Sequence, residues 1–81
     1  MDVIELGAKS RLIVENDAFD FVFDSVKQSY QTAWSKTTPE EGNLRGKLYS
    51  TVIALEDVKR ELVKFAQAGL NEELRRERDD E

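Results

Sequence analysis

A heptad repeat of apolar side chains in the second half of this 81-residue chain constrains its fold most strongly. On a helix, residues spaced alternately four and three apart form one stripe, the pattern of helices that pack lengthwise. The stripe predicts a helix over residues 43–68, which extends about 40 Å at ~1.5 Å per residue. Gly69 followed by Leu70 is typical of a helix end, because glycine readily adopts the left-handed conformation. The stripe consists of Leu44, Leu48, Thr51, Leu55, Val58, Leu62 and Phe65, with Thr51 as its one polar member.

A second amphipathic helix is predicted over residues 17–36. Asn16 is a good N-cap for it, because the side-chain oxygen can accept a hydrogen bond from a free backbone N–H one turn in. Phe21 departs from the apolar pattern of this helix and projects toward water, roughly opposite Phe19. The residues that share the apolar face, by three-and-four spacing, are Phe19, Val22, Phe23, Val26, Tyr30, Ala33 and Trp34.

The segment TTPEEGN, residues 37–43, separates the two helices and contains the single proline of the chain. A residue that precedes proline resists helical angles, so the first of these helices should end by Thr37. Thr38 can cap the next helix, Pro39 fits its first position, and Glu41 can reach back to complete a capping box. Asn43 offers a second cap, which would start the helix a few residues later. The segment is therefore expected to be a bend rather than a catalytic loop.

The two ends of the chain carry weaker signals. Residues 2–15 are predicted to form a short helix, although the apolar run at 12–14 is equally consistent with a brief extended segment. Residues 71–81 are highly charged and expected to fray. Two long helices joined by a short connection become antiparallel neighbours. The predicted fold is therefore all-α: an antiparallel helical hairpin preceded by a short N-terminal helix, one domain over residues 1–70, followed by the charged tail.

The composition excludes most catalytic and metal chemistry. The chain has no histidine and no cysteine, which removes the commonest general base, the most reactive nucleophile and the usual zinc ligands. Acidic pairs occur at helical spacing, Asp20 with Asp24 and Asp57 with Glu61, but both are expected on solvent-facing surface. No glycine-rich phosphate loop or metal motif is present. We expect a non-enzymatic protein with no catalytic, metal-binding or cofactor-binding residues and no cofactor.

The charge pattern favours protein partners. The net charge is −5, with both signs interspersed, whereas a nucleic-acid-binding surface needs a basic patch. No apolar run approaches the ~20 residues that span a bilayer. A chain of this size buries only roughly 60% of its unfolded surface, and it lacks disulfides, so association is the remaining source of stability. A homo-oligomer or a component of a larger assembly is expected, with no direct nucleic-acid or membrane contact.

Apolar side chains outside the stripe indicate where a partner would bind. Tyr49 and Ile53 point sideways or away from the stripe, and Val63 does so less extremely, as does Val52. Phe21 is comparable on the preceding helix. Contiguous apolar surface of this kind usually marks an interface. The predicted partner-binding residues are therefore Phe21, Tyr49, Ile53 and Val63, with cover by residues 3–14 of the same chain as the alternative.

Two aromatic residues near the bend allow two interpretations. Trp34 and Tyr30 have the side chains that dominate interface energetics, and they would serve as partner anchors if exposed. The interpretation we favour is that both close the end of the core next to the connection.

The order of these features also carries a family resemblance. The leading segment DVIELGAKSRLIVEND is followed by AF within a helix, then by Trp34, Thr38–Pro39, Arg45, Leu48–Tyr49, Leu55, Val58, Leu62 and Gly69. This outline resembles small helical-hairpin proteins encoded by tailed bacteriophages and prophages. The resemblance implies a non-enzymatic structural or assembly accessory that binds itself or a larger virion protein, in the virion or the host cytoplasm. The alternative is a small acidic inhibitor of a host defence or regulatory protein that imitates DNA.

Overall fold

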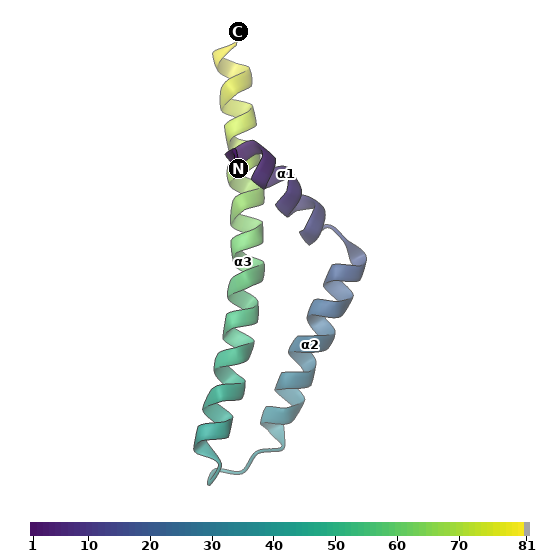
Figure 1. Ribbon diagram of the computed structural model, residues 1–81, viewed down its shortest axis with the longest axis vertical. Helices are drawn as coiled ribbons and strands as arrows, with labels where there is room; N and C mark the ends of the chain where they lie inside the picture. Colours follow the sequence, from purple (N-terminus) through teal and green to yellow (C-terminus); the bar gives the residue numbers. More distant parts are fainter. Residues whose placement is uncertain (81) are drawn as a thin grey trace.

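Three helices account for nearly all of the chain in a computed structural model that describes residues 1–80 (Figure 1). They are α1 (Val3–Val14), α2 (Asp17–Ser35) and α3 (Gly42–Asp79), and no strand occurs in that range. The prediction of an all-α fold with a short N-terminal helix is confirmed. The apolar run at 12–14 belongs to α1, so the extended alternative for it is wrong.

Local signals explain where α2 begins and ends. The side chain of Asn16 accepts a hydrogen bond of 3.0 Å from the backbone N–H of Phe19, as its position predicted. The helix ends at Ser35, ahead of Thr38, which is the residue that precedes Pro39. The Thr37 hydroxyl donates a hydrogen bond to the Trp34 carbonyl oxygen. The backbone N–H of Thr38 donates to the Glu41 carboxylate at 2.9 Å. This half of the capping box forms, but α3 begins at Gly42 with Glu41 as its N-cap, so neither Thr38 nor Asn43 is the cap that the sequence predicted.

The predicted helix end at Gly69 is wrong, because α3 continues through it for ten more residues to Asp79. Gly69 has a helical backbone and is needed for close packing rather than for a turn. A Cβ atom there would lie 2.7 Å from the Cα of Gly7 and 2.9 Å from the carbonyl oxygen of Val3. Residues 71–79 of the predicted tail are thus the last turns of α3, whereas Glu81 lies outside the described residues.

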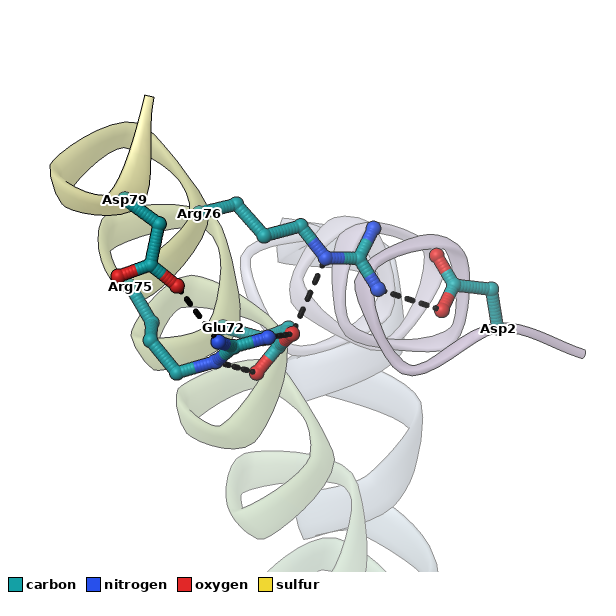
Figure 2. Close-up of polar contacts among 5 residues, drawn as sticks. All are labelled: Asp2, Glu72, Arg75, Arg76 and Asp79. Carbon is teal, nitrogen blue, oxygen red and sulfur yellow. Dashed lines mark hydrogen bonds and ion pairs between the residues drawn. The ribbon is translucent and has the colours of Figure 1, made fainter. Parts of the chain in front are cut away.

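Helix α1 crosses α3 backbone to backbone. A Cβ atom at Gly7 would meet Gly69 Cα at 2.6 Å and the Phe65 carbonyl oxygen at 2.8 Å. Ser10, one turn further along α1, is only 2% exposed. Figure 2 shows that Arg76 also links the helices, because its guanidinium lies 3.3 Å from Asp2 and donates to Glu72 at 3.0 Å. The start of the chain is therefore held against the C-terminal half of α3.

Helix α2 contacts the other half of α3 along one edge. The edge consists of Arg45, Val52 and Lys59, spaced seven residues apart. Val52 is buried, Arg45 stacks 4.6 Å from the Trp34 ring, and Lys59 lies 5.0 Å from the Phe23 ring. This edge adjoins the predicted stripe rather than coinciding with it. Val52, which the spacing placed beside the stripe, is the apolar residue of α3 that α2 covers most completely.

The molecule is an open rod. Its principal extents are 64 × 23 × 17 Å and its radius of gyration is 17.8 Å. A compact domain of this length has a radius of gyration of about 12 Å. In Figure 1, α2 diverges from α3 on leaving the connection and meets α1 well to the side of α3. Only Phe23 and Val52 are buried among the large apolar residues of the described chain.

Candidate partner-binding surface

A groove forms where α2 and α3 converge near the connection. Trp34 forms one wall from α2, and Tyr49 and Ile53 form the other from α3, with Val52 at the base. The three α3 residues occupy neighbouring positions on one side of that helix, because residues three and four apart share a face. The cation–π contact of Arg45 with Trp34 holds the indole in place. The remaining lining residues are polar: Gln31, Ser35 and Glu56.

A second hollow continues the groove toward the middle of the molecule. Glu56 belongs to both, and the new apolar members are Phe23 and Val63. Charged side chains surround them, namely Lys27, Lys59 and Arg60. The two hollows form one elongated surface, which we call the groove face: Phe23, Trp34, Tyr49, Val52, Ile53 and Val63.

The structure places the four predicted partner-binding residues in two locations. Phe21, Tyr49, Ile53 and Val63 are all exposed, with 76%, 61%, 40% and 51% of their surface accessible. Helix α1 therefore does not cover these four side chains. Tyr49 and Ile53 lie together in the groove, and Val63 lies in the adjoining hollow. Phe21 lies about 160° around α2 from Phe23, at ~100° per residue, and is separate from the groove face.

Sequence reasoning assigned two members of the groove face to other roles. Trp34 was interpreted mainly as closing the core end, and its stacking on Arg45 agrees with that, but it remains exposed and lines the groove. Phe23 was expected in the hairpin core, and it is buried, yet one edge borders the second hollow. The sequence carries no local signal for this placement, because it depends on which edge of α3 receives α2.

A second apolar surface lies on the other side of the α2–α3 contact. Measured around α3 from Val52 at ~100° per residue, Tyr49 and Ile53 lie about 60° and 100° to one side, whereas Leu55 and Val58 lie about 60° and 120° to the other. We call this second surface the stripe face. It comprises Leu44, Leu48, Leu55, Val58 and Leu62 from α3, together with Val22 and Val26 from α2.

No member of the stripe face is buried. Val58 is 58% exposed, and Leu44, Val22 and Val26 are also exposed, whereas the other three leucines are half-buried. Around α2, at ~100° per residue, Gln31 lies about 80° from Phe23 in one direction and Val22 lies about 100° from it in the other. Because Gln31 lines the groove, Val22 lies on the opposite side of α2, which is the side of the stripe face.

The acidic pairs noted in the sequence lie beside basic residues. Asp57 accepts from Arg60 at 2.6 Å, and Glu61 lies 3.7 Å from Lys64. Asp20 lies 3.6 Å from Lys59, beyond hydrogen-bonding distance. No group of three acidic side chains within residues 1–80 is placed to hold a metal ion.

The strongest electrostatic cluster lies at the C-terminal end of α3. Arg75 donates two hydrogen bonds to Glu72, of 2.6 and 3.0 Å, and Arg76 donates a third (Figure 2). These hydrogen bonds, with Arg75 contributing most, lower the pKa of the Glu72 carboxyl to about 2. Glu72 in turn raises the pKa of both guanidinium groups. The acidic charge of this segment is thus partly neutralised within α3 itself.

Comparison of the chain with protein-family models, curated proteins and solved structures found no match. None of the helices in the described part of the chain is long and apolar enough to cross a membrane.

Proposed function

We propose that this chain is a non-enzymatic binding protein, in which the hairpin of α2 and α3 presents apolar faces to another protein. Following the resemblance to proteins of tailed bacteriophages, we propose that it acts in particle assembly or within the virion, and thus in the virion or the host cytoplasm. Its partners would be itself and a larger virion protein.

The surface area of the chain is the observation that carries this proposal. A folded monomer of 9.3 kDa exposes 6105 Å² here. Compact monomers of that mass expose about 5,000 Å². Fifteen large apolar side chains within residues 1–80 are exposed, aromatic and aliphatic ones among them. Surface of this type is usually covered by another protein.

The groove face has the composition expected of a contact site for a larger protein. Tyrosine and tryptophan are enriched among residues that dominate binding energy, and Tyr49 and Trp34 line the same groove. Ile53 adds an aliphatic wall, and polar side chains rim it. We therefore propose Tyr49 and Ile53 as the central contacts, with Val63 at one end. Phe21 would be a separate contact.

Affinity capture from source cells with matched variants tests this function. The Tyr49→Ser/Ile53→Ser chain should lose a partner that the wild-type chain retains. Leu12→Ser is the control, since it removes an exposed apolar side chain of α1 that lies outside the groove. A partner retained equally by the double variant and the wild type would contradict the groove as the contact. Far-UV circular dichroism should show that both variants remain helical.

The acidic-inhibitor alternative has one supporting observation, the net charge of −5. It predicts capture that weakens steeply as salt rises, because exposed charges are screened. Apolar contacts in the groove predict capture that survives the same titration. The ion pairs of Glu72 with Arg75 and Arg76 weigh against a DNA-like row of free negative charges.

A further inference from the structure

We infer that a second copy of this chain packs antiparallel onto the stripe face, forming a two-fold symmetric four-helix bundle. This inference rests on the proposed function, and it names one partner, one face and one register. The groove face would then remain on the outside of the dimer, free for a different protein.

The heptad stripe is occupied at one end and open at the other. Beyond Leu62 it continues, with the same spacing, through Phe65, Gly69, Glu72 and Arg76. Helix α1 packs on this continuation, as the contacts of Gly7 with Gly69 and of Asp2 with Arg76 show. Over Leu44–Leu62, α2 covers only the Arg45–Val52–Lys59 edge. A helix is thus missing from the open half of the stripe.

The excess surface of the whole chain is large enough to supply the area that a second copy would cover. The exposed surface of 6105 Å² exceeds the expectation for a compact monomer by about 1,100 Å². A standard stable interface buries about 800 Å² on each partner. Heptad stripes are also self-complementary when two copies run antiparallel, which gives an isologous contact with closed symmetry.

The stripe itself defines the register. Its open half runs from Leu44 to Leu62, so a two-fold axis midway between Thr51 and Leu55 aligns the two copies over their full length. Leu55 then faces the partner's Thr51, Leu48 faces the partner's Val58, and Leu62 faces the partner's Leu44. A leucine faces a smaller side chain in the two inner layers and another leucine in the outer layer, and the polar Thr51 lies near the axis.

The valines of α2 favour the antiparallel direction. In an antiparallel pair, the α2-covered edges of both α3 helices lie on the same side, so the two α2 helices become neighbours. The surfaces of the two α2 helices that carry Val22 and Val26 then lie toward the neighbouring copy, which covers two exposed apolar residues. In a parallel pair, they would lie against the opposite edge of α3, which carries Lys47 and Glu61.

Charge on that opposite edge also fits the antiparallel pair. Lys47, Ala54 and Glu61 are spaced seven apart and are all exposed. Across the two-fold axis, Lys47 lies near the partner's Glu61. By symmetry, Glu61 lies near the partner's Lys47. Ala54 lies between them, where the helices approach most closely. Within residues 1–80, Lys47 makes no ion pair, and Glu61 has only the contact of 3.7 Å with Lys64.

Sedimentation equilibrium of the full chain tests whether the dimer forms and through which face. The expected species has twice the mass of the 9.3 kDa chain. Val58→Lys should raise the dimer dissociation constant by at least about tenfold, which corresponds to ~1.4 kcal/mol. Val63→Lys is the matched control, since Val63 is equally apolar, similarly exposed and on the groove face of the same helix. A monomeric wild type, or equal effects of the two variants, would overturn the inference.

Cross-linking tests the register, because the natural chain has no cysteine. Lys47→Cys and Glu61→Cys chains are mixed and treated with a short bis-maleimide. Cross-links between the two variants should exceed those within each, since two copies of Lys47 would lie about 20 Å apart at ~1.5 Å per residue. Predominant links between identical positions would indicate a parallel pair and overturn the inference.

These outcomes separate the inference from the proposed function. If the wild-type chain is monomeric, and the Tyr49→Ser/Ile53→Ser variant loses the captured partner, only the dimer would be overturned. If the dimer forms with the expected cross-links, but the Tyr49→Ser/Ile53→Ser variant still captures the partner, only the groove contact would be overturned.

Discussion

The α1–α3 crossing and the α2–α3 contact differ in how closely the backbones approach. At the crossing, Gly7 and Gly69 leave no room for even one Cβ atom. Along α2, the two ion pairs to α3, Lys27–Glu56 and Lys59–Asp20, both measure 3.6 Å, longer than a hydrogen bond. The short helix is therefore fixed by shape, whereas the longer one rests on large side chains that remain partly open to water. The looser α2–α3 contact therefore leaves an apolar surface that is available to partners.

The largest expected effect comes from breaking the crossing. Gly69→Leu should destabilise the chain by about 3 kcal/mol, at the upper end of what overpacking costs, because the added atoms meet backbone that cannot rotate away. Urea unfolding followed by circular dichroism measures this change. Gly46→Leu is the control in the same helix, where an added Cβ meets nothing within 4 Å. That variant should be no less stable than the wild type, since leucine favours a helix more than glycine does. Equal losses at both positions would show that the crossing is not specific.

A smaller loss is expected when the α2 contact is broken. Phe23→Ala removes one of the two large apolar side chains that are buried within residues 1–80. It should cost about 2 kcal/mol, less than in a fully enclosed core, because one edge of the ring borders a hollow. Amide hydrogen exchange should show lost protection in α2 while α1 stays protected. Simultaneous loss in both helices would mean that the two contacts form one cooperative unit.

Replacing the polar pair between α2 and α3 should tighten their contact. The oxygen Oδ1 of Asp20 is buried without a hydrogen bond, and its neighbour Lys59 occupies a position that faces the Phe23 ring. Asp20→Ala combined with Lys59→Leu should stabilise the chain by about 1 kcal/mol, because it removes an oxygen without a hydrogen bond and places an aliphatic side chain beside the Phe23 ring. Thermal unfolding checks the sign, and a lower transition temperature would show that the pair contributes more than its length suggests.

The smallest effect concerns the ion pairs near the crossing. The pKa of Glu72 is lowered in the folded chain, so its contribution to stability is complete above about pH 4.3. That contribution is lost as the pH falls toward about 2, where the carboxyl becomes protonated. Glu72→Gln should therefore show a shallower loss of stability across this range than the wild type. Parallel acid titrations of the two chains by circular dichroism would reveal the difference, and superimposable curves would count against it.

The sequence predicted the features that depend on near neighbours. Asn16 caps α2 through the N–H of Phe19, three positions away, and α2 ends before Thr37, as the nearby Pro39 predicted. Gly69 was misinterpreted because its role depends on Gly7, which lies 62 positions earlier in the chain and reaches it only after folding. Glycine followed by an apolar residue is the same signal for a helix end and for a close crossing, so spacing alone could not separate them.

The candidate surface was predicted in its exposure but not in its grouping. Phe21, Tyr49, Ile53 and Val63 were identified correctly as exposed, whereas Val52, named with them, is buried by α2. Which of them share a groove depends on which edge of α3 receives α2. Helix α2 packs on Val52 instead of the stripe, and this choice joins Tyr49 to Trp34 while it leaves Phe21 apart.

The contact between Asp2 and Arg76 brings the beginning of the chain to within a few residues of its last helical turn, far from the connection between α2 and α3. This 81-residue chain is therefore suited to circular permutation: a short peptide could join the start of α1 to the end of α3, and new ends could be opened beside Pro39. All three helices would keep their neighbours, although their order along the polypeptide would change. Such a permuted chain would show whether the proline segment contributes anything beyond connecting two helices.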